Sequence, residues 1–206
     1  MNFEKKILIV LCFISLGFMT HAQQTNRFTA RAIVGFNAAQ IRGDELAGYD
    51  FIGLNAGVHV SYPIGDKWDL GIELLYSQKG SQREMSFSSA PDLFKTSLDY
   101  LEVPIMVSIK DWYIEEGDYH KVKAHLGMFF ARLFDSSSLN PLYQDDLSDF
   151  RSNDFGIIFG VSYGFTKRIE VTARYSNSLI DFYQNEDLPA NGLKNYLWSI
   201  TCSYRL

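Results

Sequence analysis

Hydrophobic and polar side chains alternate with a period of two residues along most of the chain after its first 22 residues. The last segment shows the alternation most clearly, with Tyr196, Trp198, Ile200, Cys202, Tyr204 and Leu206 interleaved with Leu197, Ser199, Thr201, Ser203 and Arg205. Successive side chains of a strand point to opposite faces, so this pattern predicts a strand with one apolar and one almost wholly polar face. The helical period of 3.6 residues is nearly absent, which favours an all-β protein.

The same alternation recurs in seven further segments, at about 28–38, 54–62, 68–79, 100–110, 122–130, 155–165 and 169–176, before the last one at 195–206. Segments of roughly ten residues have the length that a tilted strand needs to cross a bilayer. The expected connections are short at 63–67 and 166–168, intermediate at 111–119, and long and polar at about 40–51, 80–97, 135–153 and 177–194. Short turns on one side and long loops on the other are typical of outer-membrane barrels. We therefore expect an eight-stranded antiparallel transmembrane β-barrel, closed by its first and last strands, with both ends of the mature chain on the periplasmic side.

A soluble β-sandwich or a lipocalin-like barrel would also alternate, but two features favour the membrane barrel. The polar face carries glycines and charges, which suit the narrow, side-chain-filled interior of a small barrel. Aromatic residues gather at both ends of the apolar face, as in the interfacial girdles of membrane barrels. The expected girdle comprises Phe28, Tyr62, Trp68, Tyr76, Phe155, Tyr163, Tyr175, Tyr196 and Tyr204.

Many ionisable residues fall on the polar, lumen-facing side of the expected strands. They are Arg31, His59, Asp69, Glu73, Lys79, Glu102, Lys110, Lys123, His125, Glu170, Arg174 and Arg205. Buried charges need partners, so we expect a neutralising network that plugs a small lumen. In this network Arg205 can either face Glu170 or lie level with Arg31 on the first strand, and the pairing with Glu170 is favoured. A proton or ion path along the same residues is the alternative.

The first 22 residues have the pattern of a cleaved secretory signal peptide. Lys5 and Lys6 precede an apolar run, Ile7–Met19, and the small residues Thr20 and Ala22 lie at positions −3 and −1 before an expected cleavage site between Ala22 and Gln23. The run is too short for a membrane-spanning helix, which needs ~20 residues. We therefore expect a signal peptide at 1–22 and a barrel domain at 23–206.

The expected mature chain has 17 basic and 23 acidic residues, a net charge of −6, and one cysteine, Cys202. This acidity argues against a nucleic-acid partner. A single cysteine excludes an internal disulfide and a cysteine-based metal site.

Two stretches carry a family resemblance: Leu74-Leu75-Tyr76-Ser77-Gln78-Lys79-Gly80 and Leu98-Asp99-Tyr100-Leu101-Glu102-Val103-Pro104. Together with Phe155-Gly156, Gly160, the closing Tyr204-Arg205 and the Ala22-Gln23 junction, they resemble the PorT-like outer-membrane β-barrels of Bacteroidetes. The resemblance implies an integral outer-membrane protein, and the named family member is tied to type IX secretion. The chain departs from such barrels by ending in Leu206 instead of Phe, which weakens the insertion signal that the barrel assembly machinery reads.

The expected loops offer little enzyme chemistry. They contain Ser81, Ser86, Ser88, Ser89, Ser136, Ser137 and Ser138 but no histidine, which argues against a surface Ser-His enzyme. Their acidic residues, Asp44, Glu45, Asp50, Asp135, Asp145, Asp146, Asp149, Asp154, Asp181, Glu186 and Asp187, lack the spacing of a Ca²⁺ loop and are interpreted as a solvated negative surface. The apolar loop residues are expected to cap the barrel mouth or contact a partner, capping being favoured: Phe51, Leu93, Phe94, Leu139, Leu142, Tyr143, Phe150, Phe182, Tyr183, Leu188 and Leu193.

The sequence thus favours a non-enzymatic outer-membrane protein with a structural or interaction role at the cell surface, without cofactor or metal. Expected partners are membrane lipid and lipopolysaccharide, the assembly machinery during insertion, and a secretion-system or surface protein. A lipid-modifying membrane enzyme and a small ion-conducting barrel are the alternatives.

Overall fold

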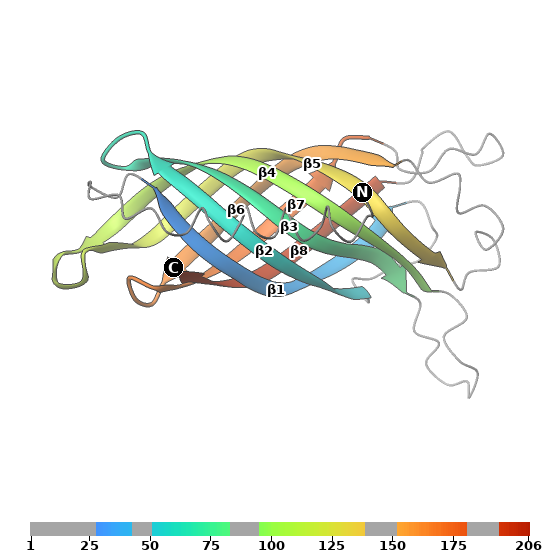
Figure 1. The fold of residues 1–206 in the computed structure, drawn as a ribbon, viewed down its shortest axis with the longest axis horizontal. Helices are drawn as coiled ribbons and strands as arrows, with labels where there is room; N and C mark the ends of the chain where they lie inside the picture. Colours follow the sequence, from blue (N-terminus) through green and yellow to red (C-terminus); the bar gives the residue numbers. More distant parts are fainter. Residues whose placement is uncertain (1–27, 43–50, 83–94, 139–151, 181–193) are drawn as a thin grey trace, which may run out of the picture.

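The computed structural model describes residues 28–42, 51–82, 95–138, 152–180 and 194–206, which form one closed barrel (Figure 1). Its strands are β1 (Thr29–Arg42), β2 (Phe51–Pro63), β3 (Trp68–Gln82), β4 (Lys95–Ile114), β5 (Tyr119–Ser138), β6 (Asn153–Gly164), β7 (Ile169–Ser178) and β8 (Lys194–Arg205), with a short 3₁₀ turn, η2 (Glu115–Gly117), between β4 and β5. Each strand pairs antiparallel with the next. β1 pairs with β8 from Arg31–Arg205 to Arg42–Lys194, which confirms the expected closed, eight-stranded barrel.

The barrel has a turn end, where short connections follow β2, β4 and β6 and where β8 finishes, and an opposite loop end (Figure 1). Several strands are longer than expected. The connection expected at 111–119 is shorter than predicted, because β4 continues to Ile114 and β5 begins at Tyr119. This hairpin projects beyond the two other turns (Figure 1) and is bent by Trp112 and Asp118, which have φ values of 55° and 48°.

The expected loop at 135–153 also begins too early. Asp135 and the serines 136–138 belong to β5, and Asp154 belongs to β6. Phe51, expected in a loop, is the first residue of β2 and is buried against Leu197. The sequence around Asp135 and Asp154 is polar and resembles a loop, but both segments are extended because they pair with neighbouring strands.

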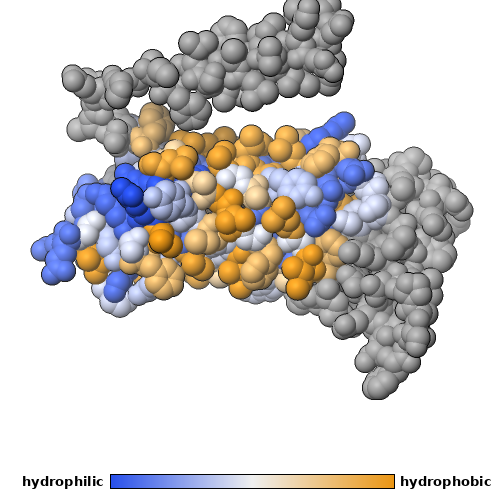
Figure 2. Space-filling view, turned by 60° about the horizontal axis from the view of Figure 1, so that its bottom comes forward, coloured by the Kyte–Doolittle hydropathy of each residue, from blue (hydrophilic) through white to orange (hydrophobic). Residues whose placement is uncertain are grey.

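The outer wall is apolar over the middle of the barrel, as the orange band in Figure 2 shows. Val34, Leu126 and Ile200 are among its exposed side chains, at 57%, 68% and 48%. The polar residues that alternate with them are buried inside, so the polarity is inverted relative to a soluble protein. Among the described residues, no helix is long and apolar enough to cross a membrane.

The interior also contains an apolar cluster that the alternation did not reveal. Leu98, Tyr100, Met106, Phe129 and Ile158 are buried together on the lumen side of β4, β5 and β6. The ring of Phe129 fits because Gly156 lies beneath it: a Cβ on this glycine would be 2.4 Å from the ring. A close approach of this kind requires glycine in the strand.

Pro104 interrupts the pairing of β3 with β4. The ladder runs to Ile72–Ile105 and resumes at Leu75–Glu102, in the same register. Because proline has no N–H, Pro104 cannot donate to the carbonyl of Glu73, which lies opposite it. The seam between β3 and β4 is therefore weakened beside the centre of the lumen.

Candidate functional site in the barrel lumen

The lumen is crossed by an ion pair between opposite walls. Arg174 on β7 binds Glu73 on β3 with both terminal nitrogens, at 2.7 and 3.0 Å, and both side chains are buried. His59 on β2 lies 3.0 Å from the same carboxylate. Bidentate arginine–carboxylate contacts have a defined geometry, so this pair fixes the position of both side chains across the lumen.

A second carboxylate, Glu170, lies nearer the turn end. The ammonium of Lys123 is 2.5 Å from Glu170 Oε2, and the guanidinium of Arg31 is 3.7 Å from the same oxygen. At the rim, Lys110 binds Asp69 at 2.7 Å. These contacts connect β1, β3, β4, β5 and β7 at one end of the lumen.

A chain of hydroxyl and imidazole groups lies between these pairs. The Nδ1 atom of His125 is 2.7 Å from Ser108 Oγ, and its Nε2 atom is 2.5 Å from Ser162 Oγ. Ser162 is in turn hydrogen-bonded to Thr172, at 2.7 Å. The buried imidazole therefore has a hydroxyl partner on each ring nitrogen.

Towards the loop end, the fully buried Lys79 is enclosed by carboxylates and rings. Its Nζ atom is 2.9 Å from Glu102 and 3.3 Å from Asp154, and Ser178 donates to Asp154 at 2.9 Å. The rings of Tyr100 and Phe129 have their centroids 5.0 and 4.4 Å from Nζ. A cation desolvated in this way needs both the carboxylates and the ring faces.

The ion-paired residues of the described lumen are balanced in charge. Five cations, Arg31, Lys79, Lys110, Lys123 and Arg174, face five carboxylates, Asp69, Glu73, Glu102, Asp154 and Glu170. The cavity that remains among the turn-side groups has a volume of about 20 Å³. That is close to the minimum space for one water molecule.

The structure brings together most of the residues that the sequence placed in the lumen. Arg31, Glu73, Glu102, Lys123, Glu170 and Arg174 take part in ion pairs, and His125 is hydrogen-bonded to serines. The expected Arg205–Glu170 contact is not among the ion pairs of the described residues. Arg205 is half-buried at the turn end opposite Arg31, and Ser203 is the residue that lies opposite Glu170.

Asp154 is the member of the network that the sequence analysis misassigned. It was interpreted as a solvated loop residue, yet it is buried and paired with Lys79. The signal was present in the alternation, because Asp154 precedes Gly156 and Ile158 on the same face of β6. A carboxylate at the end of a strand next to a long polar loop is easily counted with that loop.

The aromatic residues expected to form girdles all lie on the outer face. Phe28, Trp68, Tyr163 and Tyr204 are exposed at the turn end, with Tyr62 packed on Phe28 at 5.2 Å between ring centroids. Tyr76, Phe155, Tyr175 and Tyr196 are half-exposed towards the loop end. There Tyr175 contacts Phe159 and Trp198, each at 5.2 Å.

Most loop residues considered from the sequence lie outside the described residues, together with the segment 1–22. The exceptions are Phe51, Asp135 and Asp154, whose places are given above, and the serines at 81 and 136–138, which belong to β3 and β5. In the described ranges, no group of three His, Cys, Asp or Glu side chains is placed to hold a metal ion.

Comparison with known proteins places the chain in a family. Residues 21–184 match the family model described as the outer membrane protein beta-barrel domain. No protein with a curated description matches the chain.

Solved structures with a similar fold are distant in sequence. Ail, the attachment invasion locus protein of Yersinia pestis, is 17% identical, with 86% of this chain and 99% of that chain covered and a TM-score of 0.47. Neisserial surface protein A is 13% identical, with 87% and 97% covered and a TM-score of 0.46. OprG of Pseudomonas aeruginosa is 12% identical, with 87% and 95% covered and a TM-score of 0.45.

Proposed function

The chain belongs to the outer membrane protein beta-barrel domain family, and from this premise we propose that it is a closed, non-conducting membrane scaffold that acts through its surfaces without enzymatic activity. The observation that carries the proposal is the Glu73–Arg174 pair, which crosses the lumen between opposite walls. Ion pairs lie on both sides of it, and the charges balance. Side chains that fill the interior of a small barrel in this way leave no open path for ions or water through the lumen.

The proposal includes an orientation in the outer membrane. Short turns of such barrels face the periplasm and long loops face the exterior, so the turn end is periplasmic. The exposed rings of Trp68 and Tyr204 mark the periplasmic interface, and those of Tyr175 and Tyr196 mark the outer one. Phospholipid and lipopolysaccharide then surround the apolar wall, and the loops face surface partners.

We also propose that residues 1–22 are a cleaved signal peptide, so that the mature barrel comprises residues 23–206. Mass spectrometry of the N-terminal peptide of the protein purified from outer membranes tests this boundary, because it also detects an N-terminal glutamine that has cyclised to pyroglutamate. An N-terminus at Gln23 is the expected result, and an uncleaved Met1 would contradict it.

Conductance in planar bilayers tests the closed lumen. The wild-type protein is expected to give no stable open channel. A Glu73→Ala/Arg174→Ala variant removes both partners of the crossing pair, so it leaves no unpaired charge there and is expected to raise the leak. A reproducible channel in the wild-type protein would overturn the plug and favour an ion path.

Crosslinking in native membranes, compared with a deletion strain, tests the surface role. Captured secretion components and lost export would support the PorT-like role in secretion that the sequence resemblance implies. Captured surface proteins with normal export would support an interaction role outside secretion. Altered lipid A or phospholipid acylation in the deletion strain, without a captured partner, would overturn the non-enzymatic role.

A further inference from the structure

The charges of the lumen balance as a whole but not at its turn end. There Glu170 is the shared carboxylate of two cations, Lys123 and Arg31. Arg205 lies directly opposite Arg31 in the β1–β8 ladder, and none of the ion pairs among the described residues includes it. Like charges that face each other across two strands repel. This end of the lumen therefore has more positive than negative charge.

The surplus of positive charge adjoins the small polar cavity of the turn side, whose volume is about 20 Å³. Arg31 and Arg174 line this cavity, and both residues are more than nine-tenths buried. Among the described residues, neither Arg31 Nη1 nor Arg174 Nε has a hydrogen-bond partner. Thr201 and Ser203, which carry hydroxyl groups, line the same cavity. Buried N–H groups need an acceptor, so the cavity combines unused donors with unmatched positive charge.

Carboxylates also line the cavity, and each of them is bound to a cation. The pairs are Asp69–Lys110, Glu73–Arg174 and Glu170–Lys123. Because these pairs are matched one to one, Arg31 has no carboxylate of its own, and its guanidinium is 3.7 Å from the already paired Glu170. Within the described residues, the wall of the cavity therefore provides no separate anion for Arg31.

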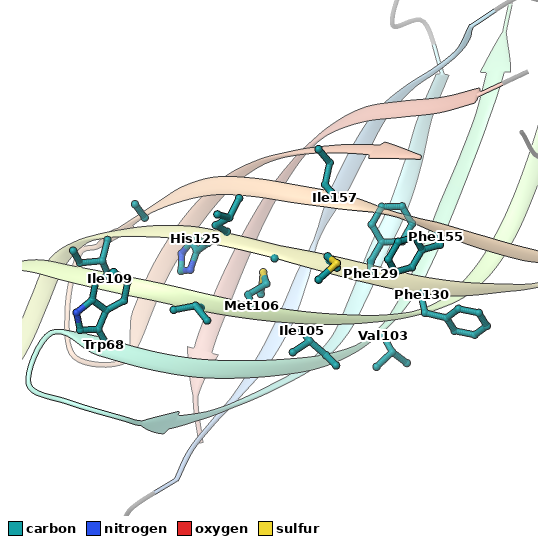
Figure 3. A pocket seen from close by; sticks show the side chains of 15 residues that line it. Trp68, Val103, Ile105, Met106, Ile109, His125, Phe129, Phe130, Phe155 and Ile157 are labelled. Atoms are coloured by element: carbon teal, nitrogen blue, oxygen red, sulfur yellow. The ribbon is translucent and has the colours of Figure 1, made fainter. Parts of the chain in front are cut away.

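The loop side of the lumen does not cancel this surplus at close range. There Lys79 faces two carboxylates, so the surplus is negative. In Figure 3, His125, which lines the cavity, lies towards the turn-end residue Trp68, whereas Phe129, whose ring lies under Lys79, is further along β5. Four residues of a strand span ~13 Å, and Met106 lies between His125 and Phe129. The apolar cluster thus separates two regions of opposite net charge.

We propose that the turn-side cavity binds one monoatomic anion, chloride, in contact with the guanidinium groups of Arg31 and Arg174 and with the hydroxyls of Thr201 and Ser203. Chloride accepts hydrogen bonds from several directions and is only slightly larger than a water molecule, so the cavity admits it and excludes sulfate or phosphate. A water molecule would satisfy the donors but leave the charge of Arg31 unmatched. The ion connects β1, β7 and β8 from inside the barrel. The site goes beyond the scaffold role proposed above and does not depend on the lumen being non-conducting.

Stability at constant ionic strength tests the site. Urea unfolding in phospholipid vesicles, followed by tryptophan fluorescence, is measured as chloride replaces gluconate, with sulfate at the same ionic strength as the control for ion size. A ligand that binds only the folded protein raises the folding equilibrium constant by the factor 1 + [L]/Kd, so above Kd we expect about a tenfold rise for each tenfold increase in chloride. Bromide should act like chloride, and sulfate should act like gluconate. Crystals grown in bromide then locate the ion through its anomalous scattering.

Three variants separate the site from general effects of salt. Arg31→Met removes the unmatched charge and leaves Glu170 paired with Lys123, so it should fold and lose the chloride dependence. Thr201→Val keeps the shape and the charges and should weaken chloride binding about tenfold, as expected for the loss of one hydrogen bond to an ion. Arg168→Met is the matched control, a turn-end arginine that does not line the cavity, and should leave the dependence unchanged. Heat-dependent gel mobility verifies that each variant is folded.

Stability that does not respond to chloride, or that responds equally to sulfate, would overturn the proposal. A chloride dependence that survives Arg31→Met would also overturn it, because the ion would then act elsewhere on the protein. Bromide found only at exposed turn-end cations such as Arg168 would show an adventitious ion only and would count against the site. An open channel in planar bilayers, together with a chloride dependence that Arg31→Met abolishes, would overturn the scaffold role and support this site.

Discussion

At the residue scale, the network shows how a buried charge is accommodated in a membrane protein. Lys79 is enclosed by two carboxylates and two rings, so its charge is compensated from several sides. The two-residue alternation of apolar and polar residues was enough to predict that Lys79 lies on the lumen face of its strand. It could not place Asp154 beside it, because that contact joins residues 75 positions apart through the closure of β3, β4, β5 and β6 into a curved wall.

Lys79→Met should destabilise the barrel by about 3 kcal/mol or more, because Glu102 and Asp154 would be left buried and unpaired. Urea unfolding in phospholipid vesicles, followed by tryptophan fluorescence, measures this loss. The triple variant Lys79→Met/Glu102→Gln/Asp154→Asn removes the uncompensated charges and should recover much of the stability. Lys110→Met, at the more accessible Lys110–Asp69 pair, should cost less. An equal loss at Lys110 would contradict the argument from burial.

At the element scale, strand alternation predicted the number, order and faces of the strands, because the period of two follows directly from backbone geometry. It failed at strand ends. β4 and β5 pair with each other from Thr96–Ser138 to Ile114–Tyr119, and no local signal in the sequence marks the ends of such long strands. The apolar lumen cluster was missed for a related reason: Met106 and Phe129 are apolar residues on the face that the alternation marks as polar, and their side chains pack closely on the strand glycines Gly127 and Gly156.

The interruption at Pro104 gives a second prediction. Pro104→Ala restores an N–H opposite the carbonyl of Glu73, so the β3–β4 ladder should become continuous. Hydrogen exchange followed by solution NMR in micelles should then show a slowly exchanging amide at residue 104. Pro63→Ala, at the exposed end of β2, is the control and should give a fast amide. A fast amide at residue 104 would mean that the seam is open for a reason other than the missing donor.

The turns after β4 and β6 are joined by Asp118 at the turn end of the barrel. Lys167 and the Tyr113 hydroxyl donate hydrogen bonds to its carboxylate, at 2.6 and 3.0 Å, and hold the pKa of Asp118 below its usual 3.8. A lowered pKa means that the contact contributes stability above the usual pKa and loses it as the pH falls through the folded value. The two turns should therefore stay joined at neutral pH and separate only in acid, below pH ~4.

An NMR titration of the Asp118 carboxyl carbon measures this dependence. Lys167→Gln should return the pKa of Asp118 towards its usual value, because Lys167 is its largest stabilising partner. Arg168→Gln should leave the pKa unchanged, since Arg168 bonds to the Tyr204 hydroxyl instead. An unshifted pKa in Lys167→Gln would show that the turns are not joined through this carboxylate.

At the scale of the whole molecule, the pairing of β1 with β8 leaves no free strand edge. The backbone N–H and C=O groups of a free edge would find no hydrogen-bond partner in the hydrocarbon of a membrane. The pairing of β1 with β8 can be tested directly through the natural cysteine Cys202. Cys202 on β8 lies opposite Val34 on β1 and opposite Val171 on β7, and Val34 and Cys202 are exposed on the outer wall. Directly opposed residues of antiparallel strands have Cα atoms ~4.5–5.5 Å apart, within the range that a disulfide spans.

Val34→Cys, in a chain with Cys12 replaced by serine, should therefore form a disulfide with Cys202 on mild oxidation. The bond would link nearly the whole barrel into one covalent ring, so the heated, unreduced protein should migrate faster on a gel than its reduced form. Val171→Cys is the positive control, because it joins neighbours in the β7–β8 hairpin and encloses only a short loop. Val58→Cys, on β2 and one strand further away, should not crosslink within the monomer. If Val34→Cys yields only intermolecular dimers while Val171→Cys closes normally, β1 and β8 are not paired and the barrel is open at that seam.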